Sequence, residues 1–409
     1  MSTPSKFRKW EAIATGLVFL VAIMVPLVLQ LTMPQREIAR SEGRKLTAFP
    51  KLKKMKWKFI KDFPEKFEKY YNDQFGGRND LLAASATLKV KVFQTSPTKD
   101  VMIGKNGWLY YTGEGALDDH LGVTRFTGEQ LLAWKEYLER RQAWLAKRNI
   151  RYVFVFAPDK QTVYPEFLPD RAAKFREGTA MDQLVAYLRQ NCSVPVLDLR
   201  PTLVEAKRLG QLYWKTDTHW MFLGEYVGYE RLTAELRTMY PMLNDSPYFY
   251  AKHPERIQQE TDLRRIMRLP GTPLEGVPAS NYTYDGRPQE VPLYQADNLR
   301  ADKQTYSVEP PHPEVPLRVL VYHDSFFNGL IKYFCPHFAK STYVWRTVSS
   351  PQKCEQEIAR VMERDQPQLF VEEMLERYAN TAPDPRYVFQ GTAEDIAVLQ
   401  AKPDSGNAH

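Results

Sequence analysis

The chain is poor in residues and patterns that mark several common classes of protein. Of its 409 residues only three are cysteines, Cys192, Cys335 and Cys354, and none stands in a C-x-x-C pair. Their spacing therefore does not indicate a zinc site or a redox-active dithiol. A disulfide between Cys335 and Cys354 and three free thiols both fit the sequence, so the cysteines do not fix the cellular compartment.

Other common signatures are missing too. The sequence has no internal repeat and no low-complexity tract, and Gly104-Lys105 does not continue into a phosphate-binding loop. A nucleotide-binding protein is therefore not indicated. Histidine occurs only seven times, which leaves few imidazoles as candidates for catalysis.

Acidic residues are fewer than basic residues. There are 56 lysines and arginines against 49 acidic residues, so the net charge is +7. This balance favours an acidic partner such as nucleic acid, anionic lipid or an acidic polysaccharide, without choosing among them. A basic protein with no acidic ligand fits equally well. With 43% hydrophobic residues, the chain has the composition for a large core in one or two domains.

One long apolar segment is present, near the N-terminus. The 24 residues from Ala12 to Gln35 carry no charge, which is enough to span a bilayer as a helix. Basic residues precede it, as in a cytoplasmic tail, although others follow it. It lacks a small-residue cleavage pattern, so we predict an uncleaved membrane anchor rather than a signal peptide. The rest of the chain is expected outside the cytoplasm.

The composition changes along the chain predict a division into segments. These are a cytoplasmic tail (1–11), the anchor (12–33), a basic juxtamembrane segment (34–99), a main domain (100–390) with an irregular proline-rich insertion at about 243–316, and a C-terminal tail (391–409).

In the main domain, apolar strand patterns alternate with helical patterns. The runs "RYVFVFAPDK", "VPVLDLR", "LRVLVYHDS" and "QPQLFVEEM" are typical of strands buried on both faces of a parallel sheet. Their alternation with helices predicts an α/β sandwich with a mostly parallel sheet. In such sheets ligands bind beyond the carboxyl ends of the strands. Four polar residues fall at those ends: Asp159, Lys160, Asp324 and Ser325.

The stretch "VLVYHDSFFNG" places a serine where a buried strand leads into a helix. At such a junction the hydroxyl of Ser325 is exposed at the sheet edge, and its N–H points toward an oxyanion formed there. A serine that caps the following helix is the simpler alternative. His323 lies beside this serine, but at a position that points elsewhere along an extended chain.

The hexapeptide "KTDTHW" holds an acid and an imidazole two residues apart, Asp217 and His219. In an extended chain such residues project to the same side, so the carboxylate orients the imidazole and leaves its other nitrogen as a base. Half of a metal site and an ordinary capped loop are the alternatives. Together with Ser325, however, the pair makes a complete nucleophile, base and orienter, and such a set needs no metal.

At this point the sequence resembles a known family. The pieces "DVMIGKNGWLYYTG", "TDTHWMFLGEYVGYERL", "HDSFFNGLIKYFCPHFAKSTYVW" and "VEEMLERY" are similar to blocks of the alginate O-acetyltransferases of the AlgJ/AlgX type. The resemblance covers roughly Ser41 to Tyr378. It implies an SGNH-hydrolase-like (flavodoxin-like) fold. The order of the motifs is permuted, because ordinary SGNH esterases carry the serine first.

The resemblance also implies roles. Ser325 would be the nucleophile, His219 the base and Asp217 its partner, in acetyl transfer to an exported polysaccharide. The implied setting is the periplasmic side of a bacterial inner membrane, with a membrane-bound O-acyltransferase as donor and no nucleic acid, metal or cofactor. Lys160, Trp220 and Asp324 are further candidates for oxyanion or substrate contacts, and Trp220 is also expected to pack its loop.

Two alternatives remain open from the sequence. The same triad would serve an esterase that releases acetyl to water, and a retired enzyme fold would serve as a polysaccharide-binding subunit. The sequence departs from the SGNH pattern at His323, where many members have glycine. The acids of "VEEMLERY" are interpreted as the ion-paired start of a helix.

Overall fold

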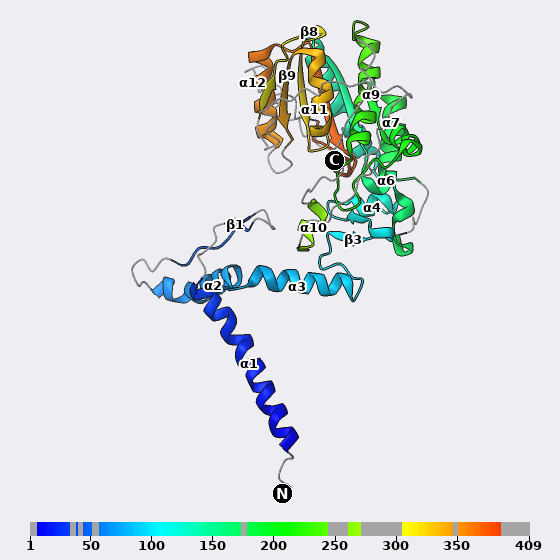
Figure 1. Cartoon of the computed structure of the whole chain (residues 1–409). Coiled ribbons are helices and arrows are strands. Elements are labelled where there is room, and N and C mark those ends of the chain that lie inside the picture. Colours follow the sequence, from blue (N-terminus) through cyan, green and yellow to red (C-terminus); the bar gives the residue numbers. More distant parts are fainter. Residues whose placement is uncertain are drawn as a thin grey trace, which may run out of the picture. The chain divides into compact units, whose positions relative to one another are not determined.

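The computed structural model describes residues 6–32, 38–39, 44–50, 57–172, 178–243, 261–270, 305–346 and 351–385. The chain divides into two compact units, coloured along the sequence in Figure 1. The first comprises Met1–Lys99 with Glu260–Thr272, and the second comprises Asp100–Gln259 with Pro273–His409.

The first unit is mainly helical. Its elements are α1 (Lys6–Thr32), β1 (Ile38–Ala39), β2 (Arg44–Lys45), α2 (Trp57–Gln74), α3 (Arg78–Lys91) and α10 (Asp262–Ile266). The helix α2 ends just before Gly76-Gly77, and Gly77 adopts a positive φ of 74°.

The predicted anchor falls in α1. Across the described parts of the chain, no helix has both the length and the apolar character needed to cross a membrane. The membrane anchor therefore stays a prediction from the sequence.

The second unit is built on a six-stranded sheet with the order β6-β5-β10-β8-β9-β7. The strands are β5 (Arg151–Ala157), β6 (Val196–Asp198), β7 (Tyr306–Val308), β8 (Val315–His323), β9 (Phe338–Trp345) and β10 (Leu369–Leu375). All neighbours pair in parallel except β7, which lies antiparallel to β9 at one edge. The predicted mostly parallel sheet is confirmed.

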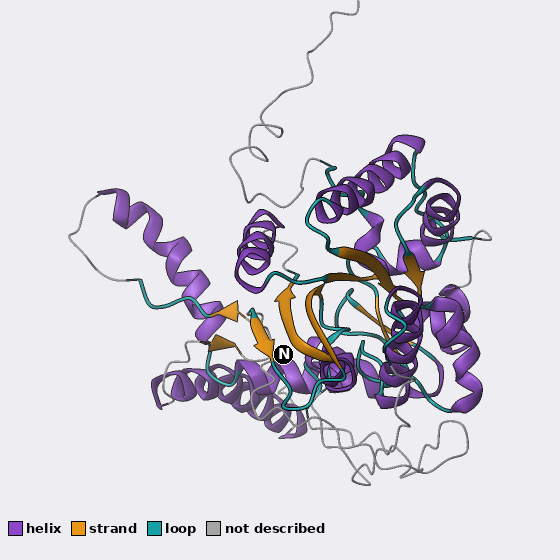
Figure 2. Cartoon of the chain, turned by 90° about the horizontal axis from the view of Figure 1, so that it is seen from above, coloured by secondary structure: helices purple, strands orange, loops and turns teal. Residues whose placement is uncertain are grey.

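Helices cover both faces of this sheet (Figure 2). They are α4 (Ala116–His120), α5 (Gly128–Ala146), α6 (Lys160–Val163), α7 (Ala180–Asn191), α8 (Arg200–Ala206), α9 (Phe222–Met239), α11 (Asn328–Phe334) and α12 (Pro351–Asp365). Short 3-10 helices join them: η1 (Lys105–Gly107), η2 (Pro165–Phe167), η3 (Asp170–Ala172), η4 (Lys207–Leu209), η6 (Cys335–His337) and η7 (Glu376–Asn380).

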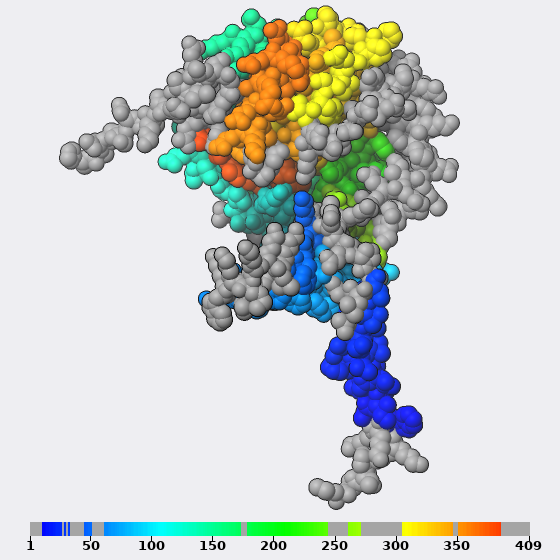
Figure 3. All heavy atoms as spheres, turned by 90° about the vertical axis from the view of Figure 1, so that its left-hand side faces the viewer, coloured from blue at the N-terminus to red at the C-terminus, as the bar shows by residue number. Residues whose placement is uncertain are grey.

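Alternation along the strands divides the core into two layers. On β5, Phe154 and Phe156 pack against α5, α7 and α12, whereas Val153 and Val155 face α8, α9 and α11. Every strand can therefore be apolar on both sides, as the continuous runs predicted. The helix α12, orange in Figure 3, lies at the surface of its layer.

The order of the strands places a ligand site. When the strands are counted from β8, the parallel order β9-β8-β10-β5-β6 becomes 2-1-3-4-5, the flavodoxin-like arrangement. The chain is thus a permuted version of that fold, as the motif order predicted. The connections diverge between β8 and β10, and ligands bind in the crevice beyond such a switch point. Ser325 follows β8 at this place.

Several smaller features of the second unit are also defined. A hairpin forms from β3 (Val101–Ile103) and β4 (Leu109–Tyr111), and Thr127 and Gln130 make a capping box at the start of α5. The three cysteines are free thiols. Most of the predicted insertion at 243–316 lies outside the described residues.

One interpretation is wrong. Glu372 and Glu373 do not start a helix, because they lie inside the buried strand β10. Glu376 and Arg377 follow in η7 and are also buried. Buried partners from distant segments, described below, make these charges compatible with a strand.

Candidate active site

The nucleophile candidate lies in a tight turn between β8 and α11. Ser325 is half-buried, and the adjacent Asp324 is almost fully buried. The Asp324 carboxylate accepts hydrogen bonds from the N–H groups of Phe326, at 3.0 Å, and Leu375, at 2.8 Å. Asp324 therefore fixes the serine turn to the end of β10 and faces the main chain rather than solvent.

The imidazole candidate lies in a loop closed by a bridge between Tyr213 and Trp220. Asp217 Oδ1 accepts from the main-chain N–H of His219 at 3.0 Å and lies 2.7 Å from its ring Nδ1. A carboxylate only accepts, so Nδ1 carries the proton and Nε2 is left as the base.

His219 and Ser325 are brought together from 106 residues apart. The distance from His219 Nε2 to Ser325 Oγ is 2.8 Å, within hydrogen-bonding range. Asp217, His219 and Ser325 thus form an unbroken chain in the order acid, imidazole, hydroxyl. About a third of the His219 side chain is exposed, so a small molecule can reach the hydroxyl side of the ring.

Lys160 holds the loop that carries His219 through hydrogen bonds to its main chain. Its side chain is buried, and its Nζ donates to the main-chain carbonyls of Trp214, Lys215 and Asp217 at 3.1, 3.0 and 2.7 Å. All three ammonium protons are used in this way. The geometry gives Lys160 a positioning role, with no proton directed at a substrate.

Trp220 joins the two loops. Its buried indole N–H donates to the main-chain carbonyl of Phe326 at 3.1 Å, and the two rings lie 5.2 Å apart at a steep angle. The ring of Phe326 also lies 5.1 Å from that of His219. The predicted packing role of Trp220 therefore includes a direct hydrogen bond to the serine turn.

His323 is not placed to act as the base. It is buried, and its Nδ1 lies 2.7 Å from the carbonyl oxygen of Asp324. Burial lowers the pKa of His323 to about 4, so its ring is neutral near pH 7. Its ring packs against aromatic side chains rather than toward Ser325.

A layer of buried acids lies under the serine turn, and its burial was not predicted from the sequence. Glu373 Oε2 accepts from the N–H of Asp324 at 3.0 Å, and burial raises the pKa of both carboxyls. Nearby, Glu376 Oε2 accepts from the N–H of Asp159 at 2.8 Å, and burial raises the pKa of Glu376 to about 8. Burial therefore favours the protonated form of each of these carboxyl groups relative to an exposed one.

The N–H of Ser325 is the main-chain oxyanion donor expected from the sequence. Within the described residues this N–H donates to no acceptor, whereas the neighbouring Phe326 N–H is taken by Asp324. The group is therefore free to bind charge that develops beside Ser325 Oγ.

The fold and this set of residues define an SGNH-hydrolase-like α/β protein. Residues 101–309, just over half of the chain, match the model of the SGNH hydrolase-like domain family of the acetyltransferase AlgX. The chain belongs to this family, which confirms the resemblance stated from the sequence. The matched span contains Asp217 and His219 and ends before Ser325.

Curated relatives agree with this placement. Proteins named "Probable alginate O-acetylase AlgJ" from Pseudomonas syringae pv. tomato and Pseudomonas aeruginosa are each 27% identical over 204 residues. The matched region covers 49% of this chain and 50% of the first, and 50% of this chain and 50% of the second. The chain thus spans about half the length of the curated relatives it matches.

Two solved structures are similar over a larger share. The O-acetyltransferase domain of Pseudomonas putida AlgJ is 19% identical, with a TM-score of 0.44, covering 73% of this chain and 98% of that one. Pseudomonas aeruginosa AlgX is 15% identical, with a TM-score of 0.46, covering 73% of this chain and 68% of that one.

Proposed function

We propose that this protein is an O-acetyltransferase that acetylates hydroxyl groups of an exported polysaccharide through an acetyl-Ser325 intermediate. The observation that carries the proposal is the continuous contact from Asp217 through His219 to Ser325, with distances of 2.7 and 2.8 Å. These contacts place a base directly on a hydroxyl at the ligand edge of the sheet.

In the first half-reaction, His219 Nε2 takes the proton of Ser325 Oγ as this oxygen attacks the acetyl carbonyl of the donor. The N–H of Ser325 stabilises the oxyanion that forms. The bond between the carbonyl carbon and the donor's leaving group then breaks, and the imidazolium returns its proton to that group. Asp217 stabilises the imidazolium in between.

In the second half-reaction, a sugar hydroxyl replaces the departed donor. His219 takes its proton while the sugar oxygen attacks the carbonyl carbon of acetyl-Ser325. The bond from that carbon to Oγ breaks, and Oγ recovers a proton from the imidazolium. The cycle moves one acetyl group and consumes no other reactant.

The proposed acceptor is an alginate-like acidic polymer, because the curated relatives are named as probable alginate O-acetylases. The proposed donor is a membrane-bound O-acyltransferase, and the proposed site is the periplasmic face of the inner membrane. A single N-terminal anchor at 12–33 would hold the second unit there.

The test uses the full chain with a small acetyl ester as donor and defined uronate oligosaccharides as acceptors. We expect acetylated oligosaccharides by mass spectrometry, and an acetyl group on the peptide that contains Ser325. Acetylation of the acceptor that persists in Ser325→Ala would overturn the proposal.

The effect of the acceptor on the rate of donor consumption distinguishes acetyl transfer from hydrolysis. About a third of the His219 side chain is exposed, so water also has access to the base, which favours an esterase as the second candidate. A transferase consumes donor faster as acceptor is added, whereas an esterase releases acetate at the same rate without it. Binding of the oligosaccharides with no turnover of the donor would instead identify a polysaccharide-binding subunit.

A further inference from the structure

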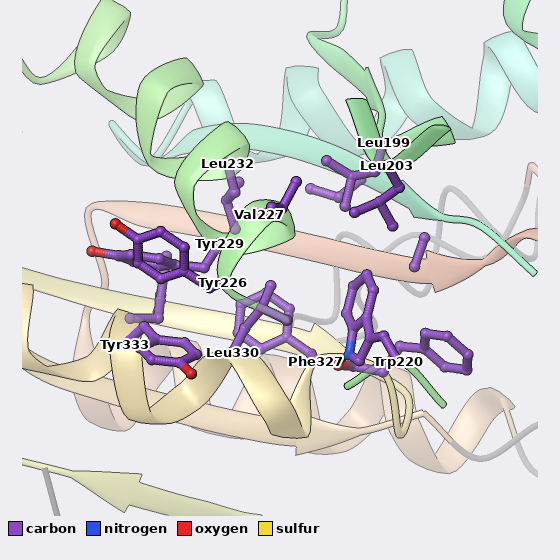
Figure 4. Packing of buried hydrophobic residues seen from close by; sticks show 14 of the residues in the cluster. Leu199, Leu203, Trp220, Tyr226, Val227, Tyr229, Leu232, Phe327, Leu330 and Tyr333 are labelled. Atoms are coloured by element: carbon purple, nitrogen blue, oxygen red, sulfur yellow. Dashed lines mark hydrogen bonds between the residues drawn. The ribbon is translucent and has the colours of Figure 1, made fainter. Parts of the chain in front are cut away.

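The catalytic loops lead directly into two helices that pack against each other. The helix α9 begins three residues after His219, and α11 begins three residues after Ser325. Figure 4 shows the packing between them, with Tyr226 and Tyr229 of α9 near Leu330 and Tyr333 of α11. We call this contact the α9–α11 seam. Any slide of one helix along the other moves the base relative to the nucleophile.

A partly buried ion pair crosses the seam close to the catalytic loops. Lys332 Nζ lies 2.6 Å from Glu225 Oε2, and their side chains are only 20% and 14% exposed. The ammonium group also lies 4.6 Å from the ring centre of Phe222, which is the first residue of α9. Partial burial makes such a pair stronger than one at the surface, because water screens it less.

The backbone of α11 is shaped to receive this carboxylate. A Cβ atom at Gly329 would lie 2.5 Å from Cγ and Oε1 of Glu225, closer than real Cβ atoms come to other atoms. Glycine at this position leaves room for the present conformation of Glu225, and a Cβ atom there would displace the carboxylate from its place against α11. The fit is specific to the ion pair, since the obstructed atoms belong to Glu225.

One turn further along α9, a second polar contact joins α9 to η6, which directly follows α11. The Tyr229 hydroxyl is hydrogen-bonded to His337 Nε2, and His337 Nδ1 lies 2.5 Å from Glu314 Oε2. Between the two polar contacts, the ring of Tyr333 packs 5.6 Å from Tyr226 and 5.5 Å from Tyr229. The seam is therefore pinned at two points, and only the first lies next to the catalytic loops.

We propose that Glu225 and Lys332 are positioning residues that set the distance from His219 Nε2 to Ser325 Oγ. This inference rests on the proposed function and names what holds its base on its nucleophile. A charge-assisted hydrogen bond weakens steeply as its atoms move apart or out of line, so the ion pair resists a slide of α9 along α11. A misplacement of about 1 Å at a reacting pair lowers its rate by up to about 100-fold.

The test compares Glu225→Gln, Lys332→Met and Gly329→Ala in the full chain. The last variant keeps both charges but removes the space that Glu225 occupies. We expect kcat and the rate of acetyl-Ser325 formation to fall about 10- to 100-fold in all three, with KM changed less than about twofold. Folding is monitored by circular dichroism and urea unfolding.

The matched control lies on the same helix. Glu235 pairs with Arg231, at 3.1 Å, within α9 and does not cross the seam. Glu235→Gln removes a carboxylate of the same kind and is expected to keep the wild-type kcat. A charge swap, Glu225→Lys with Lys332→Glu, is expected to recover part of the rate that either single change loses.

Two results would overturn the inference. Wild-type kcat in Gly329→Ala and Lys332→Met, with a reactive Ser325, would reject the positioning role and leave the proposed function intact. If the rate falls only in proportion to the free energy of unfolding in urea, and KM and kcat change alike, the ion pair has a structural role only. An unreactive Ser325 in the wild-type chain would instead overturn the proposed function, and this inference with it.

Discussion

The indole N–H of Trp220 donates to the main-chain carbonyl of Phe326 at 3.1 Å. Each of these residues directly follows a member of the proposed triad, so this one bond connects the histidine loop to the serine turn. Trp220→Phe removes the donor and leaves a buried carbonyl without it. We expect the free energy of unfolding to fall by about 1–3 kcal/mol and kcat to fall further than KM changes.

A second buried tryptophan supplies the control. The Trp134 side chain is fully buried on the other face of the sheet, and its indole nitrogen has no hydrogen-bond partner among the described residues. Trp134→Phe loses the same volume and no hydrogen bond. If it lowers kcat as much as Trp220→Phe does, the bond to Phe326 has no part in catalysis.

The three carbonyls held by Lys160 give a second prediction. Lys160→Met leaves the carbonyls of Trp214, Lys215 and Asp217 without their shared donor. We expect a loss on the order of 3 kcal/mol in urea unfolding and a strongly reduced rate of Ser325 acetylation. Lys160→Arg keeps the charge, but a planar guanidinium does not match three converging carbonyls, so it is expected to be impaired too. Full activity in Lys160→Arg would contradict this role.

The proposed triad was predictable because its signals are local. A buried strand that ends in a polar turn marks Ser325, and the spacing of two residues aligns Asp217 with His219. The strand runs also predicted the sheet, since burial on both faces leaves a continuous apolar pattern.

The supporting contacts were not predictable, since they join distant segments. The carbonyls bound by Lys160 lie 54 to 57 residues further along the chain. Glu372 was interpreted as part of an ion-paired helix start, because the arginines that neutralise it come from distant segments, α5 and the residue after β9. The glycine at 329 carried no signal, since its constraint comes from Glu225 on another helix.

The buried carboxyl groups beneath the serine turn make the free energy of unfolding depend on pH, and Glu376 is the clearest case. Burial raises the pKa of Glu376 to about 8 from an ordinary 4.5; Arg200 opposes this rise and Asp159 adds to it. Between these values the native state keeps a proton that the unfolded chain releases. The stabilisation from this proton is complete below the unfolded pKa and is lost as the pH rises toward 8, by at most about 1.4 kcal/mol per pH unit.

Glu376→Gln isolates this effect, because an amide of the same shape does not titrate. Urea unfolding from pH 5 to pH 8 should show stability falling more steeply in the wild-type chain than in the variant. Parallel curves for the two proteins would show that Glu376 keeps its ordinary pKa in the native state.

The last prediction concerns an arginine of α5 that pairs with a buried carboxylate of β10. Arg141 of α5 is fully buried and lies 2.8 Å from Glu355 Oε1 and 3.0 Å from Glu372 Oε2. Arg141→Met would leave these buried carboxylates short of a counter-charge, so we expect a loss of about 3–5 kcal/mol in the free energy of unfolding.

The neighbouring Arg140 pairs with Glu136 at the surface, at 3.4 Å, with half of its side chain exposed. Arg140→Met is expected to change stability by less than about 1 kcal/mol, because water screens such pairs. Equal losses in the two variants would mean that helix propensity, rather than the buried charge, sets the cost. A loss confined to Arg141→Met would show that one side chain of α5 stabilises β10. This strand carries Glu373, which lies beneath the serine turn.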